Sequence, residues 1–312
     1  MAQHAKSDAS PQVLRDALRP GDGGEIVLIG FPHDAGVARN GGRAGARLGP
    51  ERFRAALGRY GSLRHPHLPL SLDTLSLTDA GDVPPGLTLE EAHIHLTRIV
   101  GEVLDKGGAP FVVGGGNDQS YANAKALLNR HPPGTAGVIN IDAHLDVRPL
   151  LDGRAHSGSP FRQLLEDPRF SGERFVEFAA QGPQCLRDHA DYVSRRGGRI
   201  AWLEEDLRVR GVAAAFRGFL EHLGHGKGPL FVSFDLDAVA AAEAPGVSCP
   251  GILGLTAQEA VDIAFAAGAH PGVALFDLSE YNPEIEEERT GRLAVALFYH
   301  FCLGLAQRRL QS

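Results

Sequence analysis

Seven short apolar runs, rich in β-branched and aromatic residues, alternate along the chain with longer segments that have room for helices. The runs begin at Glu25, Phe111, Gly137, Arg174, Arg199, Pro229 and Val273. Runs of this kind are typical of strands buried on both faces. The segments expected to be helical are residues 89–106, 120–130, 211–223, 256–268 and 290–307. Strands that alternate with helices predict an α/β fold, in which helices flank a parallel sheet.

The length of the chain favours a single domain. A chain of 312 residues can form one α/β domain with a full core. Because no linker and no internal repeat interrupts residues 25–312, we expect this segment to be one domain. Residues 1–24 lack apolar periodicity and are predicted to be a loose N-terminal arm.

The acidic balance of the chain argues against nucleic acid and membranes as partners. Its 31 Lys and Arg against 38 Asp and Glu give a net charge of −7, which repels phosphate backbones and anionic lipids. We find no secretory signal and no stretch apolar enough to span a bilayer, so we expect a cytoplasmic protein. Three widely spaced cysteines argue against a disulfide framework or a thiolate metal site.

An acidic motif follows the run that begins at Gly137. Asp142, His144 and Asp146 occupy alternating positions directly after it. Side chains two positions apart on an extended segment project to the same side, so these three can converge on one point. Two carboxylates and one imidazole suit Mn²⁺ or a similar divalent ion. Burying them without a cation or hydrogen-bond partners would be costly, which argues against an incidental solvated loop.

A second acidic motif, Asp235 and Asp237, ends the run that begins at Pro229. Alone, this segment also fits the DxDxV pattern of phosphatases, in which Asp235 would be the nucleophile. Ligands of open α/β sheets bind at the carboxyl ends of the strands, so two acidic strand ends favour one shared crevice. Four carboxylates and a histidine there predict two cations that share bridging carboxylates.

Two further strand ends complete the predicted crevice. The glycines at 114–116, followed by Asn117, allow close approach of a backbone or a ligand. They lack the Lys-Ser/Thr pair of a P-loop, so we exclude a nucleotide site. Glu280 follows the last run, and a carboxylate matches an amidinium or guanidinium group in two-pronged geometry. A surface or helix-capping carboxylate is the alternative for Glu280.

Together these motifs resemble the ureohydrolase superfamily, which includes arginases and agmatinases. Four segments match in order: residues 114–118, 142–146, 233–237 and 279–283. The resemblance implies a three-layer α/β/α sandwich around a mostly parallel, eight-stranded sheet. It also implies that a water or hydroxide bridging two Mn²⁺ ions attacks the carbon of a guanidinium or amidine group.

Further segments resemble formimidoylglutamase in particular. They are residues 34–43 with 49–50, residues 157–163 and residues 244–248. The implied reaction converts N-formimidoyl-L-glutamate and water to L-glutamate and formamide, in histidine catabolism. The activity of an arginase, an agmatinase or a guanidino-acid hydrolase is the alternative within the superfamily.

The resemblance assigns metal ligands by position. Asp142 and Asp235 would bridge both metal ions. Asp146 would complete one metal site and orient the attacking hydroxide, and it is therefore a predicted catalytic residue. His144 and Asp237 would complete the other metal site.

The resemblance also assigns residues to the substrate. Glu280, the second predicted catalytic residue, would engage the cationic carbon group. Arg148 would contact a substrate carboxylate, which suits the planar fork of a guanidinium. Arg43 and Arg162 are weaker candidates for the same contact, with a structural salt bridge as the alternative for each. Ser157 stands at the position of the proton-shuttle histidine of arginases. Formimidoylglutamases also lack this histidine, and the resemblance assigns Ser157 to substrate binding.

One position departs from the family pattern, because Asn117 replaces the usual histidine ligand. An amide oxygen can bind a hard cation, but it is a weaker donor than imidazole toward transition metals. Three outcomes follow: a weakened but occupied site, a single-metal enzyme, or a metal-free, non-catalytic relative. The expected partners are a small amidine or guanidine substrate that carries carboxylates and, by resemblance, further copies of the chain in a trimer or hexamer.

Overall fold

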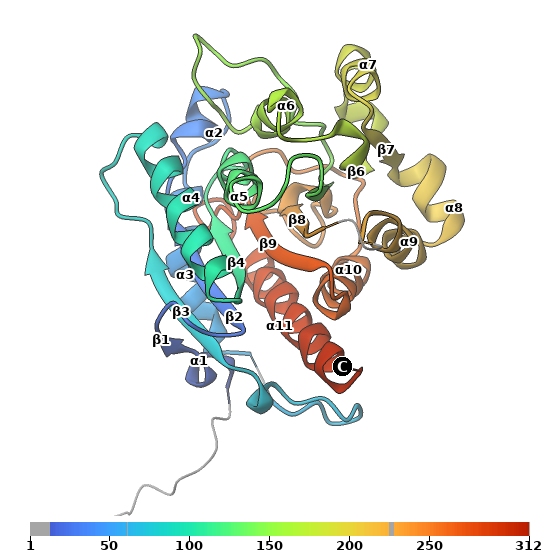
Figure 1. Cartoon of the computed structure of the whole chain (residues 1–312). Coiled ribbons are helices and arrows are strands. Elements are labelled where there is room, and N and C mark those ends of the chain that lie inside the picture. The colour runs from blue at the N-terminus through green and yellow to red at the C-terminus, as the bar shows by residue number, and fades with distance from the viewer. Residues whose placement is uncertain (1–12, 61, 225–227, 312) are drawn as a thin grey trace, which may run out of the picture.

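A parallel sheet forms the centre of the computed structural model, which describes residues 13–60, 62–224 and 228–311 (Figure 1). In the described residues the sheet has nine strands in the order β1-β3-β2-β4-β9-β8-β5-β6-β7, and all neighbours pair in parallel. The strands are β1 (Arg19–Pro20), β2 (Ile26–Phe31), β3 (Leu77–Asp82), β4 (Ala109–Gly114), β5 (Gly137–Ile141), β6 (Phe175–Ala180), β7 (Arg199–Trp202), β8 (Leu230–Asp235) and β9 (Val273–Ser279).

Helices cover both faces of this sheet (Figure 1). The helices are α1 (Leu14–Ala17), α2 (Ala35–Arg39), α3 (Gly49–Leu57), α4 (Leu89–Asp105), α5 (Gln119–Leu128), α6 (Pro160–Glu166), α7 (Arg187–Arg195), α8 (Arg208–Arg210), α9 (Val212–Gly224), α10 (Ala257–Ala269) and α11 (Glu288–Gln311). Helices α3, α9, α10 and α11 contribute to one hydrophobic cluster, and α4, α5, α6 and α7 contribute to the other.

Alternation along the central strands divides the core into these two clusters. Ile26 and Leu28 of β2 belong to one cluster, whereas Val27 and Ile29 belong to the other. Successive side chains of a strand point to opposite faces, so a strand that is apolar throughout fills both layers. The predicted α/β/α sandwich is confirmed.

Local sequence signals fix two of the longer helices. Thr88 precedes α4, and its side-chain oxygen accepts a hydrogen bond from Glu91 N while the Glu91 side chain accepts one from Thr88 N. Thr256 and Glu259 form the same capping box at the start of α10. Each box satisfies two backbone donors that would otherwise be unpaired at the helix N-terminus.

The sheet has one strand more than the eight we expected. Strand β3 was missed because its sequence, Leu-Thr-Asp-Ala-Gly-Asp, is not an apolar run. Arg54 of α3 pairs with Asp79 and Asp82 of this strand, at 2.7 and 2.5 Å. These ion pairs allow a polar strand near the sheet edge.

The predicted loose arm also differs from the structure in part. Residues 1–12 lie outside the described residues. Leu14 is fully buried in one of the hydrophobic clusters, and Arg19–Pro20 pairs with β3. The segment from Leu14 to Pro20 therefore packs against the sheet edge, where one buried leucine and one parallel pairing hold it.

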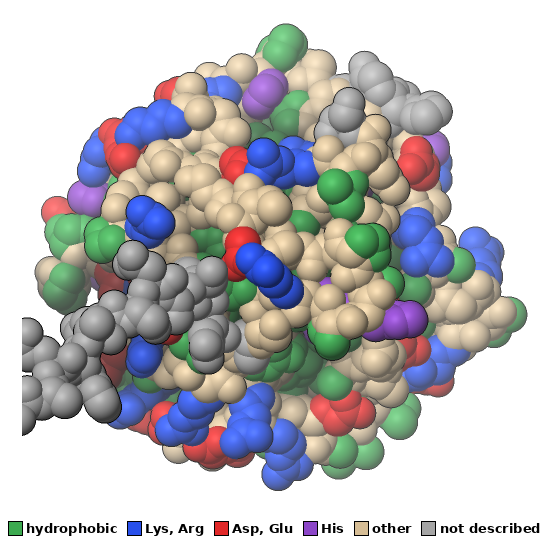
Figure 2. All heavy atoms as spheres, turned by 90° about the horizontal axis from the view of Figure 1, so that it is seen from below, with side chains coloured by type: hydrophobic (Ala, Val, Ile, Leu, Met, Phe, Trp, Pro, Cys, Tyr) green, Lys and Arg blue, Asp and Glu red, His purple; other side chains and the backbone are tan. Residues whose placement is uncertain are grey.

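Figure 2 views the molecule from below and shows one side of its surface. Lys and Arg side chains are interspersed there with Asp and Glu. None of the helices in the described ranges combines the length and apolar character that crossing a bilayer requires.

The contact between α10 and α11 generates a prediction about stability. A Cβ at Gly304 would collide with Phe265 O and lie 2.7 Å from Ala269 N, whereas a Cβ at Gly218 in α9 meets nothing within 4 Å. We expect Gly304→Ala to lower the free energy of unfolding by about 1–3 kcal/mol through overpacking. Gly218→Ala should raise it by about 0.5–1 kcal/mol through helix propensity. Urea denaturation measures both, and equal effects of the same sign would contradict the close contact.

Candidate metal centre

Four of the sequence motifs lie on neighbouring strands. Strands β4, β9, β8 and β5 are adjacent in the sheet, and Asn117, Glu280, Asp235 and Asp142 lie at or just beyond their carboxyl ends. Ligands bind at this end of open α/β sheets. Sequence positions as far apart as 117 and 280 therefore meet at one edge of the sheet.

The acidic side chains form two groups that share Asp142. One contains Asp142, His144 and Asp237, and the other contains Asp142, Asp146 and Asp235. Within each group the potential ligand atoms all lie within 4.8 Å of one another. Asp142, Asp235 and Asp237 are at most 4% exposed. The structure thus brings together the five residues that the sequence motifs singled out.

The same kind of hydrogen bond orients the first aspartate of both acidic motifs, at residues 142–144 and 235–237. Asp142 Oδ1 accepts a hydrogen bond from His144 N at 2.7 Å, and Asp235 Oδ1 accepts one from Asp237 N at 2.9 Å. A carboxylate that bonds to the backbone two residues ahead closes a tight turn directly after the strand. In the first motif the turn leaves His144 Nδ1 3.4 Å from Asp142 Oδ1.

Two predicted catalytic residues have left-handed backbone conformations. The φ angles are 43° at Asp146 and 66° at Glu280, a region that few non-glycine residues adopt. Glu280 N donates to Gly115 O at 2.8 Å, and Phe161 N donates to Asp146 O at 3.1 Å. Such strain persists where surrounding contacts enforce it, and it occurs frequently at functional sites.

The imidazole of His144 lies between the carboxylates of Asp142 and Asp237. Its Nδ1 lies 3.0 Å from Asp237 Oδ2 and 3.4 Å from Asp142 Oδ1. The charge of Asp237 raises the pKa of His144 well above its usual value. Burial opposes ionisation of Asp142, but hydrogen bonds and charge from His144 hold its pKa below the usual value. A proton on His144 thus offsets part of the repulsion without a metal ion, and a cation bound by His144 would replace that proton, because a ligating imidazole is neutral.

The remaining carboxylates lack sufficient positive charge nearby. Burial, followed by repulsion from the neighbouring carboxylates, raises the pKa of Asp146, Asp235 and Glu280. Asp237 Oδ1 and Glu280 Oε2 are buried without a hydrogen-bond partner among the described residues. Oxygen and imidazole donors of this kind bind hard and borderline divalent cations. The donor set and the unpaired oxygens therefore fit a divalent metal ion.

Asn117 contacts this cluster through its amide nitrogen. Nδ2 donates to Asp146 Oδ2 at 2.9 Å and to Asp142 Oδ2 at 3.3 Å. Oδ1 instead accepts hydrogen bonds from the hydroxyls of Ser120 and Ser279, at 2.8 and 3.2 Å. In this orientation Asn117 holds the carboxylates as a donor, and ligation of a cation through Oδ1 requires the amide to rotate.

A buried polar network lies behind Asn117. Ser120 Oγ also contacts Asp277 Oδ2 and Ser233 Oγ, each at 3.0 Å. Asn123 Nδ2 donates to Asp277 Oδ2 at 2.7 Å. Burial raises the pKa of Asp277 to about 6 despite these hydrogen bonds. The sequence analysis did not identify this network, because its members come from α5, β8 and β9.

A cavity of about 290 Å³ opens over the cluster. Its lining includes His144, Asp146, Asp235, Asp237 and Glu280, together with Arg148, Ser157 and Arg43. Asn40 connects two of these residues, because its Nδ2 donates to Ser157 Oγ at 3.1 Å and its Oδ1 accepts from Arg148 at 3.2 Å. The guanidinium of Arg148 thus faces the cavity in which the acidic cluster lies.

The two weaker arginine candidates have different positions. Arg43 lines the cavity, and its guanidinium donates to the carbonyl oxygens of Ser248 and Val247 at 3.1 and 2.8 Å. Arg162 does not line it. It pairs with Glu166 at 2.6 Å and stacks over the Tyr192 ring at 3.9 Å. The structure favours the salt-bridge alternative for Arg162.

Six further residues of the cavity were not assigned a role from the sequence, although Ser248 lies in the matching segment 244–248. They are Gln184, Cys185, Leu186, His189, Ser248 and Cys249. They come from the segments around α7, which carry no recognisable motif, and from the loop after β8. Burial raises the pKa of the Cys185 thiol to about 12, so it is not a reactive thiolate.

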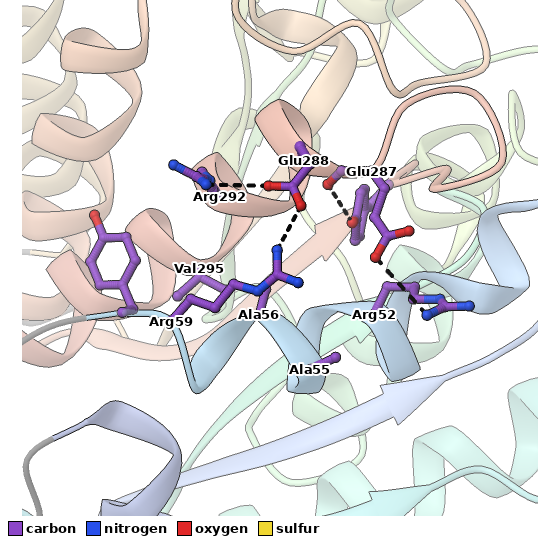
Figure 3. Close-up of a pocket in the computed structure, with 10 residues that line it drawn as sticks. Arg52, Ala55, Ala56, Arg59, Glu287, Glu288, Arg292 and Val295 are labelled. Atoms are coloured by element: carbon purple, nitrogen blue, oxygen red, sulfur yellow. Dashed lines mark hydrogen bonds and ion pairs between the residues drawn. The ribbon is translucent and has the colours of Figure 1, made fainter.

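A second cavity, of about 200 Å³, lies between α3 and the start of α11 (Figure 3). Arg59 and Arg292 both pair with Glu288, at 2.6 and 3.3 Å, and Arg52 lies 4.0 Å from Glu287. Each of these arginines therefore has a glutamate partner. Among the described residues, no cluster of potential metal ligands includes a residue of this cavity.

Sequence and structure are both similar to those of known proteins. The family described as "Arginase family" matches residues 24–304. Formimidoylglutamase from Geobacillus thermodenitrificans is 35% identical over 293 residues, covering 91% of this chain and 85% of the relative. The crystal structure of Trypanosoma cruzi formiminoglutamase with Mn²⁺ is 51% identical with a TM-score of 0.90, covering 96% of this chain and 100% of that chain. Formimidoylglutamase from Bacillus subtilis is 25% identical with a TM-score of 0.86, covering 97% and 96%.

The buried carboxyl of Asp277 generates a prediction about pH. Its pKa of about 6 in the folded protein exceeds the unfolded value of about 4, so its contribution to stability is present below about pH 4 and is lost as the pH rises through 6. The stability lost by neutral pH is about 3 kcal/mol. We expect Asp277→Asn to remove this loss, because the amide does not ionise. Urea denaturation at a series of pH values should show that the free energy of unfolding decreases less with rising pH in the variant than in the wild type. Identical pH profiles would contradict the prediction.

Proposed function

Because the chain belongs to the arginase family and is a hydrolase acting on C–N bonds of linear amidines, we propose that its substrate is N-formimidoyl-L-glutamate. One observation carries this proposal: the cavity contains an acidic cluster suited to metal ions and, on its wall, the guanidinium of Arg148. An amidine with carboxylates is complementary to both. The similarity to formimidoylglutamases supports the choice among linear amidines.

The residues present support Mn²⁺ as the cofactor, with two ions expected. We propose Asp142 and Asp235 as shared ligands, with Asp146 on one side and His144 and Asp237 on the other. Divalent ions in such a site lower the pKa of water and polarise the electrophilic group. The Mn²⁺ in the crystal structure of the T. cruzi relative supports this identity.

The chain's own residues position the substrate and transfer protons. We propose that Glu280, whose Oε2 is buried and unpaired, binds the formimidoyl group through a charge-assisted hydrogen bond. Asp146 orients the attacking water and accepts its proton. The water oxygen bonds to the formimidoyl carbon, and the C–N bond to glutamate breaks. The second proton leaves this oxygen as the carbonyl group of formamide forms, and both protons of the water end on the departing amine, which leaves as an ammonium group. Formamide and glutamate are the products.

We assign carboxylate recognition to Arg148, with Ser157 linked to it through Asn40. The amide oxygen of Asn40 accepts a hydrogen bond from Arg148, and its amide nitrogen donates one to Ser157. The Arg43 guanidinium already donates to two carbonyl oxygens, so we assign it to shaping the cavity wall.

Two alternatives remain within the family. A guanidine substrate would release urea or a related amide instead of formamide. A non-catalytic relative would have lost metal binding through Asn117, whose amide nitrogen faces the carboxylates. We favour the enzyme because the other five potential ligands converge.

The proposal predicts a metal-dependent product. Purified protein loaded with Mn²⁺ should release formamide from N-formimidoyl-L-glutamate, and metal-depleted protein should not. Asp235→Asn should abolish turnover and lower the bound Mn²⁺, whereas Glu51→Gln, an exposed matched change, should alter neither. A product assay combined with metal analysis decides the matter. Urea from arginine or agmatine, without formamide, would assign the site to a guanidine substrate.

A second prediction concerns the carboxylate contact. Arg148→Gln should raise KM for N-formimidoyl-L-glutamate by about tenfold or more, since a hydrogen bond to a charged group contributes about 1.5–3 kcal/mol. Because the lost contact binds ground state and transition state alike, kcat should change little. Arg162→Gln serves as the control, because Arg162 pairs with Glu166 outside the cavity. Steady-state kinetics with equal KM increases in both variants would refute the assignment.

A further inference from the structure

A buried carboxyl lies behind the metal centre and has no part in the proposed chemistry. Glu177 of β6 pairs in register with Asn140 of β5, and both side chains are fully buried. Asn140 Nδ2 donates to Glu177 Oε1 at 2.9 Å and to Asp142 Oδ2 at 3.2 Å. Asn140 is therefore a bridge between Glu177 and a proposed metal ligand.

One oxygen atom of each of these two side chains has no hydrogen-bond partner in the part of the chain that the structure describes. Asn140 Oδ1 and Glu177 Oε2 are both buried without a hydrogen-bond partner among the described residues. An ionised carboxylate only accepts hydrogen bonds, so it would leave two unpaired acceptors in the core. A neutral carboxyl can donate from Oε2 to the unused amide oxygen, while Oε1 still accepts from the amide nitrogen. One proton thus satisfies both atoms.

The surroundings of Glu177 favour the neutral form. Burial, the largest effect, raises the pKa of Glu177 well above its usual value. A second negative charge behind the acidic cluster would add to its repulsion. A neutral carboxyl instead fixes the amide without changing the charge of the site.

We propose that Glu177 is a neutral positioning residue that locks the amide of Asn140, so that its N–H group orients Asp142 for metal binding. This inference rests on the proposed metal centre. The other oxygen of Asp142 accepts from His144 N at 2.7 Å, so the carboxylate is held from both sides. Outer partners of metal ligands commonly contribute about 10–100-fold to metal affinity.

The paired variants Glu177→Gln and Glu177→Ala test this role. Glutamine is neutral and can pair with Asn140 in the same way, so the Mn²⁺ dissociation constant should stay within about twofold of the wild type. Alanine removes the pairing, and the constant should rise about tenfold or more. Calorimetric titration of metal-depleted protein measures both, and Glu173→Gln, an exposed residue beside β6, is the charge control.

Two outcomes would overturn the proposal. Equal weakening in Glu177→Gln and Glu177→Ala would mean that the carboxylate charge matters, and unchanged affinity in Glu177→Ala would mean that Asn140 needs no lock. Should Glu177→Ala not fold, infrared difference spectra of Mn²⁺-treated wild type minus Glu177→Gln decide instead. A protonated carboxyl band supports the neutral state and its absence refutes it. Neither readout uses substrate, so failure to release formamide leaves this test intact.

Discussion

Repulsion among buried carboxylates is the constraint on which the site depends. Asp142, Asp146, Asp235 and Asp237 meet at the end of the sheet with one imidazole between them. A buried charge is tolerated only when it is paired or coordinates a metal. The amides of Asn117 and Asn140 supply hydrogen bonds, and divalent ions, with His144 as a neutral ligand, would supply the positive charge. The surrounding fold acts as a rigid support that prevents the aspartates from separating.

Much of the fold could be predicted from the sequence because its core strands are apolar throughout and its helices carry clear boundaries. The helix expected at 89–106 is observed at Leu89–Asp105, and that expected at 256–268 at Ala257–Ala269. Strand β3 was missed because Arg54 stabilises its aspartates from another element. Its polarity is explained by a tertiary contact that no local pattern reveals.

The candidate site shows the same division between local and long-range information. The alternation of Asp142, His144 and Asp146 is local, and the structure brings these residues together as expected. The orientation of Asn117 depends on hydroxyls of Ser120 and Ser279, and the latter is far away in sequence. The same holds for Arg162, whose partners lie on α6 and α7, away from the cavity. Which atom of a side chain faces the site is decided by packing.

The strand order has a consequence for how the protein is made. Strand β9, near the end of the chain, lies between β4 and β8 in the middle of the sheet. During synthesis, β4 and β8 emerge from the ribosome before the strand that joins them, so each waits with an unpaired edge. Pairings between distant segments form slowly, and such edges are prone to aggregation. A nascent chain that has not yet reached Val273 therefore lacks both its central strand and Glu280. Its two unpaired strand edges make it prone to aggregation at that stage.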